Sequence, residues 1–118
     1  MTTEEARRFL QSVFDRLFDP AASAEDVGAF FSPDYVQDVD GRRLDRGEFL
    51  NHVRVLKSTL DSASVTFKEI AADGATIADI HGQVGLAGGT REPTTDVVVL
   101  AGLVVVDADQ HVCRPLWR

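Results

Sequence analysis

Apolar residues recur at intervals of three and four positions along the first third of the chain, which is the period of an amphipathic helix. The first apolar stripe runs from Ala6 to Phe18. Thr2 is followed three residues later by Glu5, the spacing of a capping box. A proline disfavours the helical conformation in the residue before it. The pattern therefore predicts a first helix that begins after Thr2 and ends before Pro20.

Two more helices are expected from caps and apolar spacing. Ser23 is a good N-cap for a short helix over residues 24–31. Ser32, with a proline after it, is a further candidate cap. Asp45 and Glu48 form a second capping-box pattern, which predicts a third helix. The inner stripe of that helix is predicted to be Phe49, Val53, Leu56 and Leu60.

The apolar period changes to two after the third helix, which is the period of a β-strand. Asp73 and Gly74 mark a turn, so the first two strands are expected to form a hairpin. Gly102 interrupts the third strand and predicts a bulge or a sharp bend there. The predicted strands cover residues 64–72, 75–87, 94–107 and 111–118. Three helices followed by four antiparallel strands predict an α+β fold in one domain, 1–118.

The third predicted strand is apolar on both of its faces from Val97 to Val106. A strand covered by helices on one side alone would alternate apolar and polar residues. Something must therefore cover its second face, and the chain has no helices left to do so. We expect a second copy of the chain, giving a homodimer that associates through the sheet.

Composition narrows the possible partners and locations. Twelve basic against nineteen acidic residues give a net charge of −7, which disfavours nucleic acids and anionic membranes as partners. The single Cys113 cannot form an internal disulfide and is expected to be inert. The first residues lack a signal-peptide pattern, and no run of apolar residues is long enough to span a membrane. We expect a cytoplasmic protein.

Two segments, "FFSPDYVQDVDG" and "DRGEFLNHVRVL", follow the amphipathic first helix and precede the long strands. With that order of elements, the chain resembles the nuclear transport factor 2-like superfamily. This superfamily includes ketosteroid isomerases, scytalone dehydratase and SnoaL-like polyketide cyclases. The resemblance implies a cone-shaped fold, in which a strongly curved antiparallel sheet wraps around three N-terminal helices. It also implies an apolar pocket inside the cone and dimers formed through the sheet.

The resemblance assigns a role to Asp38. The segment "VQDVDG" is similar to the segment of ketosteroid isomerases that carries their proton-shuttling aspartate, and Asp38 falls on that position. A carboxylate held there against apolar walls would take a proton from carbon. Alternatively, Asp38 and Asp40 are solvated loop acids, or Asp40 and Gly41 form a simple turn.

The chain departs from the isomerase pattern in two places. Phe14 stands about where those enzymes have a tyrosine on the first helix, and the third strand has no acid where they have a protonated aspartate. Because losing one such donor costs about 100-fold or more in rate, isomerisation by that mechanism is not expected. Phe14 is retained as a candidate pocket-lining residue.

A histidine on the second strand is a second candidate for catalysis. Asp79, His81 and Gln83 share one strand face with Ile77. If this face is concave, His81 enters the pocket, where an imidazole is suited to acid–base work. The dehydratase and cyclase branches of the resembled superfamily use histidine and aspartate in this general way. If instead this face meets solvent, Ile80, Val84 and Leu86 form the core. The sequence leaves both alternatives open.

Three further residues are candidates for binding a substrate: Tyr35, His52 and Trp117. The sequence has no metal-ligand spacing, phosphate-binding loop or nucleophile elbow, so no metal and no other cofactor are expected. Two functions remain open. One is a cofactor-independent acid–base enzyme, of isomerase, cyclase or dehydratase type, acting on an apolar small molecule. The other is a non-catalytic ligand-binding or dimerisation domain.

Overall fold

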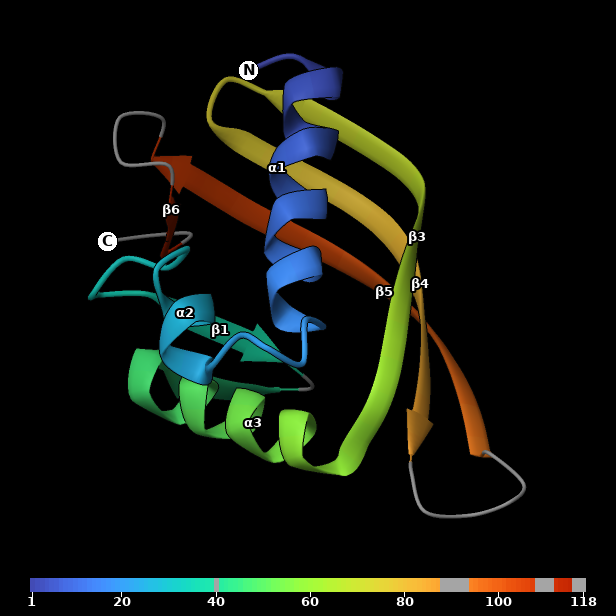
Figure 1. Ribbon diagram of the computed structural model, residues 1–118. Coiled ribbons are helices and arrows are strands. Elements are labelled where there is room, and N and C mark those ends of the chain that lie inside the picture. Colours follow the sequence, from blue (N-terminus) through green and yellow to red (C-terminus); the bar gives the residue numbers. More distant parts are fainter. Residues whose placement is uncertain (40, 88–93, 108–111, 116–118) are drawn as a thin grey trace.

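Three helices and a short hairpin precede a four-stranded antiparallel sheet in the described part of the chain (Figure 1). The computed structural model describes residues 1–39, 41–87, 94–107 and 112–115, with side chains except at 59–63, 83–87 and 94–101. The helices are α1 (Thr3–Leu17), α2 (Ala24–Gly28) and α3 (Arg46–Thr59). The strands are β1 (Val36–Val39), β2 (Arg42–Asp45), β3 (Leu60–Asp73), β4 (Thr76–Ala87), β5 (Thr94–Asp107) and β6 (Val112–Arg114).

The predicted helix caps at Thr2, Ser23 and Asp45 are confirmed. At α1, the Thr2 side chain accepts a hydrogen bond from Glu5 N, and Glu5 accepts one from Thr2 N, each at 3.1 Å. At α3, Asp45 Oδ1 accepts from Glu48 N at 2.8 Å, and Glu48 Oε1 accepts from Asp45 N at 3.2 Å. Each reciprocal pair satisfies backbone N–H groups that have no partner within the helix. Ser23 caps α2 as predicted. The helix ends at Gly28 and is therefore shorter than the predicted 24–31.

The prediction of a helix start at Ser32 is wrong. The Ser32 backbone N–H donates to Cys113 O at 2.8 Å, and Cys113 N donates to Phe30 O at 2.6 Å. These bonds join the segment after α2 to β6, so its backbone groups are already satisfied without a helix. The Ser32 hydroxyl donates to Asp34 Oδ1 at 2.7 Å instead of capping a following turn.

The main sheet has the strand order β3-β4-β5-β6, with every neighbouring pair antiparallel. It curves around the helices, and α1 lies across its concave face (Figure 1). The α+β class with a curved antiparallel sheet around three helices is therefore confirmed. Gly74 lies in the turn between β3 and β4 with φ of 60°, a conformation that glycine adopts readily. The small β1–β2 hairpin was not predicted, because its strands are short and mostly polar.

A β-bulge in β3 alters which residues face the helices. The pairing of β3 with β4 shifts register between Phe67 and Glu69, so one residue of β3 is extra. As a result Phe67 and Ile70, three positions apart, both pack against the same core cluster. In β5, by contrast, pairing with β4 runs through Gly102 without a register shift, so the expected bulge at Gly102 is wrong.

The core has two apolar clusters. One cluster joins α2 and α3 to β6, and within it the rings of Phe31, Tyr35 and Phe49 all contact one another. The other cluster lies under α1: Ala6, Leu10, Ile77 and Val106. Phe9 and Val104 pack against both clusters, which joins them into one interior. Within the predicted stripe of α3, Phe49 and Val53 are buried and Leu56 is half-buried.

The opposite face of the sheet carries exposed apolar side chains. Ile80 is 41% exposed and Leu103 is 52% exposed, and both alternate along their strands with residues that face α1. We call the exposed Ile80 and Leu103, with Ala78 and Ala71, the convex apolar patch. Val104 is not part of it, since its side chain packs inward.

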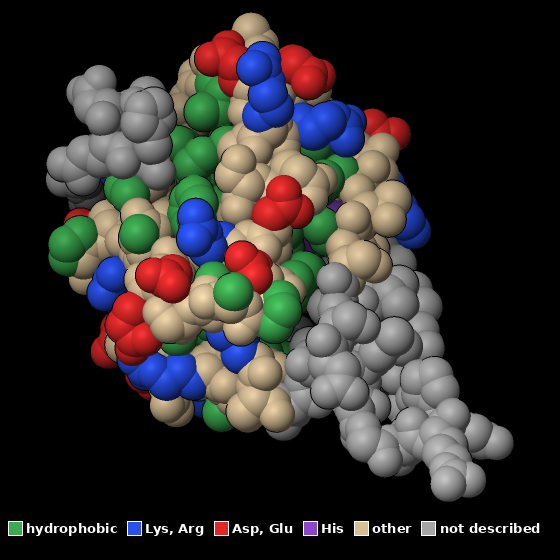
Figure 2. All heavy atoms as spheres, viewed as in Figure 1, with side chains coloured by type: hydrophobic (Ala, Val, Ile, Leu, Met, Phe, Trp, Pro, Cys, Tyr) green, Lys and Arg blue, Asp and Glu red, His purple; other side chains and the backbone are tan. Residues whose placement is uncertain are grey.

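Charged side chains are mixed on the face that carries the helices. Figure 2 shows Lys and Arg side chains lying beside Asp and Glu side chains there. None of the helices in the described residues has the length and apolar composition needed to cross a bilayer.

Candidate active site

Asp79 and His81 form a buried polar pair on the concave face of β4. His81 Nδ1 lies 2.5 Å from Asp79 Oδ2, and each residue is only 6% exposed. The two residues are two positions apart on one strand, so both side chains project from the same face of the sheet. Ile77, two positions earlier, is fully buried on that face. The sequence left two orientations open for this row, and in the structure the described side chains of Ile77, Asp79 and His81 face the helices.

Aromatic rings surround the imidazole of His81. The ring of Phe14, from α1, lies 5.1 Å from it, and the ring of Phe67, from β3, lies 6.1 Å away. Phe14 and Phe67 also contact each other edge to face, with centroids 5.7 Å apart. These rings place the polar pair in apolar surroundings, where electrostatic interactions are stronger than in water.

The hydrogen bond between the pair determines which imidazole nitrogen carries the proton when the ring is neutral. An ionised carboxylate can only accept hydrogen bonds, so in that state Nδ1 carries the proton that Asp79 accepts. The neutral imidazole then has its lone pair on Nε2, the nitrogen able to take up a proton. The contact with the carboxylate also fixes the orientation of the ring. This is the logic by which a buried aspartate supports the histidine base of a serine-protease triad.

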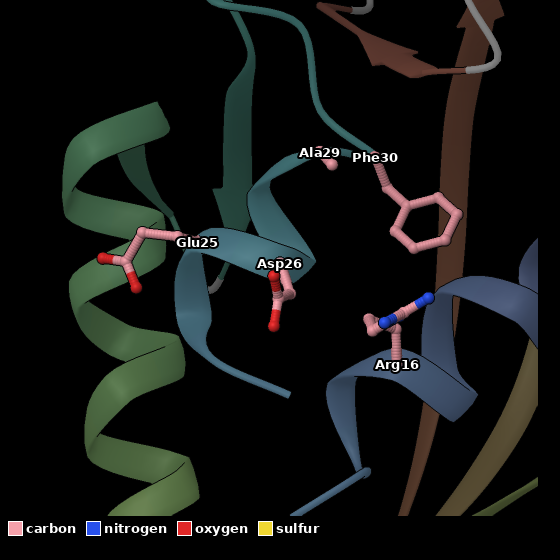
Figure 3. A pocket seen from close by; sticks show the side chains of 5 residues that line it. All are labelled: Arg16, Glu25, Asp26, Ala29 and Phe30. Atoms are coloured by element: carbon pink, nitrogen blue, oxygen red, sulfur yellow. The ribbon is translucent and has the colours of Figure 1, made fainter. Parts of the chain in front are cut away.

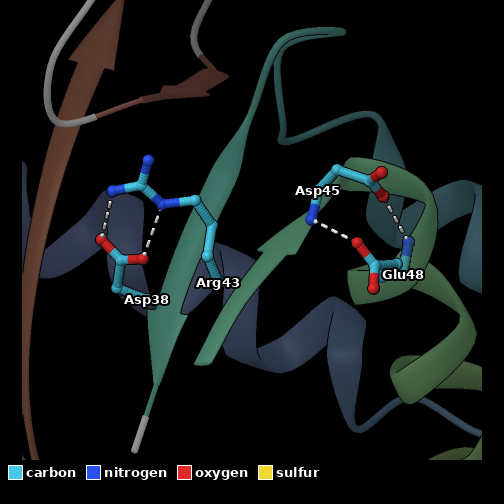
Figure 4. A network of polar contacts seen from close by, with 4 residues as sticks. All are labelled: Asp38, Arg43, Asp45 and Glu48. Atoms are coloured by element: carbon cyan, nitrogen blue, oxygen red, sulfur yellow. Dashed lines mark hydrogen bonds and ion pairs between the residues drawn. The ribbon is translucent and has the colours of Figure 1, made fainter. Parts of the chain in front are cut away.

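Asp38 lies elsewhere, on the β1–β2 hairpin. Its side chain is 45% exposed and forms an ion pair with Arg43, its cross-strand partner (Figure 4). Arg43 Nε donates to Asp38 Oδ1 at 3.1 Å, and Nη2 donates to Oδ2 at 3.5 Å. The expectation that Asp38 faces an apolar wall is therefore wrong. The alternative of a solvated acid describes its surroundings, because the hairpin turns this side chain toward water and a cation.

The other candidate residues are not gathered at one place. His52 is exposed on α3. The ring of Tyr35 contacts those of Phe31 and Phe49, and burial, with the nearby Cys113 thiol, raises the pKa of its hydroxyl well above the ordinary range. Trp117 lies outside the described residues. Among the predicted binding residues whose side chains the structure describes, Phe14 contacts His81.

The prediction for Asp79 was incomplete. The sequence placed it in the row with His81 but assigned it no role. A signal for the pair was present, since an acid two residues before a histidine on a strand puts both side chains on one face. What the sequence did not supply was the burial that turns this spacing into a short hydrogen bond.

A separate surface cleft lies between the end of α1 and α2. It has a volume of about 310 Å³ and is lined by Arg16, Glu25, Asp26, Ala29 and Phe30 (Figure 3). Asp26 Oδ2 accepts a hydrogen bond from Ser23 N at 2.9 Å, and bonds with Ser23 lower the pKa of Asp26. Glu25 points toward α3, where it pairs with Arg54. These acids serve the helix cap and an ion pair, so the cleft is a weaker candidate than the Asp79–His81 pair.

Among the described residues, no three His, Cys, Asp or Glu side chains gather closely enough to hold a metal ion. The polar pair itself offers two donors, fewer than the three protein ligands typical of catalytic zinc. The expectation of a protein without metal or other cofactor stays a prediction.

Solved structures with the same arrangement of elements are numerous. A protein from Shewanella putrefaciens that is named as a putative SnoaL-like polyketide cyclase matches with a TM-score of 0.77 and 8% identity. The match covers 94% of this chain and 76% of that one. An epoxide hydrolase of the LEH-like type from M. tuberculosis matches with a TM-score of 0.73 and 20% identity, over 96% and 80% of the two chains. A chain whose name contains NTF2 and an NTF2-like protein of unknown function from Exiguobacterium match as well.

This chain has the nuclear transport factor 2-like fold. A hypothetical protein from Catenulispora acidiphila with a ketosteroid isomerase-like fold, solved with trimethylamine, also matches, with a TM-score of 0.69 and 13% identity over 91% and 80% of the chains. At such identities the likeness shows the fold alone. A nuclear transport factor 2-like fold supports several chemistries, so the activity has to be argued from the site.

Sequence comparison adds little about activity. No family model matches the sequence. An uncharacterized protein of Schizosaccharomyces pombe is 28% identical over 79 residues. The match covers 67% of this chain and 61% of the length of the yeast protein.

Proposed function

We propose that this protein is a cofactor-independent acid–base enzyme that acts on an apolar small molecule, with Asp79 and His81 as its proton-transferring pair. The observation that carries the proposal is the 2.5 Å contact between two buried polar side chains on the concave face of the sheet. Burying a polar pair in an apolar interior is costly unless both partners are satisfied, and such pairs are concentrated at functional sites.

In this proposal the two residues have different roles. His81 Nε2 takes a proton from the substrate or from a water molecule, and Asp79 orients the imidazole and stabilises its charged form. The aromatic side chains of Phe14 and Phe67 favour a substrate that is apolar around one polar group, such as a carbonyl or an epoxide. Proton removal from carbon beside a carbonyl would support isomerase, cyclase or dehydratase chemistry. Proton removal from water would support hydrolysis of an epoxide.

The experiment compares variants on a panel of apolar enolisable ketones, β-hydroxyketones and epoxides. His81→Gln and Asp79→Asn keep the approximate size of each side chain. We expect His81→Gln to lower kcat/KM about 100-fold or more, the usual contribution of a general base. Asp38→Asn is the matched control, because Asp38 lies on the exposed hairpin, and it should retain full activity.

Two results would contradict the proposal. One is turnover that His81→Gln leaves unchanged. The other is turnover that depends on Asp38, which would return the role of base to the residue selected by family resemblance. Because the proposal includes no metal, elemental analysis of the active protein should find no stoichiometric metal. We also propose that the protein is cytoplasmic.

The alternative function is a non-catalytic domain that binds ligands or assembles as a dimer. The convex apolar patch favours assembly, since Ile80 and Leu103 are large apolar side chains left exposed on the sheet. We propose that a second copy of the chain covers this patch. A dimer of this kind is compatible with catalysis, because the patch and the Asp79–His81 pair lie on opposite faces of β4.

A further inference from the structure

Gly102 lies beside the polar pair on the neighbouring strand. Its Cα pairs with that of Asp79 across β4 and β5. A Cβ added to Gly102 would lie 2.5 Å from Asp79 Oδ1 and 3.6 Å from Asp79 Cγ. The first distance is shorter than real Cβ contacts, so the Asp79 carboxylate occupies the space that a side chain at position 102 would fill.

Other reasons for a glycine at this position do not apply. The pairing of β5 with β4 has no register shift at Gly102, so the residue does not form a bulge there. Its φ is outside the left-handed range that distinguishes Gly41 and Gly74. A glycine inside a strand weakens that strand, because it lacks a side chain to pack and loses more backbone entropy on folding. The remaining reason for a glycine is that it leaves room for the Asp79 carboxylate, which any other residue would fill with its Cβ.

We propose that Gly102 is a positioning residue for the Asp79–His81 pair, an inference that rests on the proposed function. One carboxylate oxygen, Oδ1, lies over Gly102, while the other, Oδ2, meets His81 Nδ1. Both oxygens belong to one rigid carboxylate group. A methyl group at position 102 would displace Oδ1 and thereby move Oδ2 away from the imidazole.

β3, the strand on the other side of β4, is irregular beside the Asp79–His81 pair. The bulge of β3 begins directly after Phe67, which pairs with His81 and whose ring lies 6.1 Å from the imidazole. The polar pair is therefore held between a glycine on β5 and a bulged strand on β3. The residue that the bulge redirects is Ile70, which pairs with Asp79 and packs toward the core.

The test uses Gly102→Ala, Asp79→Ala and the double variant, with Leu103→Ala as a control on the opposite face of β5. Nitrogen-15 and proton NMR of the imidazole report which ring nitrogen carries the proton and whether a strongly downfield Nδ1–H signal is present. We expect the wild type and Leu103→Ala to show that signal. Gly102→Ala and Asp79→Ala should lose it.

Urea unfolding provides the second readout. Gly102→Ala should lower the unfolding midpoint in the wild-type background. In the Asp79→Ala background the clashing carboxylate is gone, so the same substitution should leave the midpoint unchanged or raise it. If Gly102→Ala does not fold, folding of the double variant supports the proposal, and failure of the double variant to fold overturns it.

The remaining outcomes separate this inference from the proposed function. A Gly102→Ala protein that keeps the Nδ1–H signal, or an equal loss of stability in both backgrounds, overturns the positioning role. A wild type without the signal overturns it as well. If every NMR and unfolding result is as expected but no substrate is turned over, the proposed function fails while the role of Gly102 stands.

Discussion

The ring of Phe14 on α1 lies 5.1 Å from the imidazole of His81 on β4, with 58° between the ring planes. This contact joins the first helix of the chain to the sheet at the proposed catalytic pair. Phe14 is also the residue that stands about where ketosteroid isomerases have a tyrosine. The position thus faces the interior, but here it supplies an apolar wall in place of a hydroxyl donor.

Replacing Phe14 tests that wall. We expect Phe14→Leu to lower the free energy of unfolding by about 1 kcal/mol. The ring contacts of Phe14 are lost, while most of its apolar volume is kept. The proton NMR signals of the His81 ring should shift, since the ring current of Phe14 is removed. Phe18→Leu is the control, because Phe18 packs on Phe14 with centroids 5.9 Å apart. Equal shifts of the His81 signals in both variants would contradict the contact.

Removing the charge of Asp79 should cost more stability than removing that of Asp38. Asp79→Asn is expected to destabilise the fold by about 1–3 kcal/mol, because the hydrogen bond from His81 loses its charged acceptor and the amide adds a buried NH2 group that needs a partner. Asp38→Asn should change the unfolding free energy by less than about 1 kcal/mol, since exposed ion pairs contribute little. Added salt should reduce the effect of Asp38→Asn further. Urea unfolding at low and high salt measures both; a larger loss for Asp38→Asn would reverse our assignment of the two sites.

The convex apolar patch should hold a homodimer together. Leu103→Lys or Ile80→Lys places a charge on the patch, and we expect either variant to become monomeric at micromolar concentration. Val55→Lys is a matched control, because Val55 is an equally exposed apolar residue on α3, 53% exposed. It should leave the dimer intact. Sedimentation equilibrium measures the masses, and a monomeric wild type would show that the patch has no partner copy.

Alkaline pH should destabilise the protein through Cys113. Burial raises the pKa of the Cys113 thiol from 9.0 to about 12, so the folded state holds this proton more tightly than the unfolded chain. The resulting stability is fully present below pH 9.0 and is lost as pH rises toward about 12. Cys113→Ala should show a smaller decrease in unfolding free energy over this range, although it starts less stable because of the cavity. Ellman's reagent at pH 8 should react with Cys113 only after unfolding; rapid labelling of the native protein would contradict this burial.

The sequence by itself determined the three helices, their caps at Thr2, Ser23 and Asp45, and the antiparallel strands of the main sheet. The capping boxes at Thr2 and Asp45 need only residues three positions apart, so they form as soon as the local helix does. Apolar periodicity likewise predicted which side of α1 would be buried. These features depend on neighbours in the chain, and the sequence contains all of those neighbours.

The candidate site needed the tertiary structure. A period of two does not distinguish the two faces of β4, and only packing against Phe14 shows that Asp79 and His81 face inward. Position in a resembled family could not show that Asp38 turns outward to Arg43, because that depends on a hairpin pairing. The role of Gly102 depends on the register that sets it opposite Asp79. In each case the deciding contact joins residues from two different helices or strands. Those residues come together only when the chain has folded.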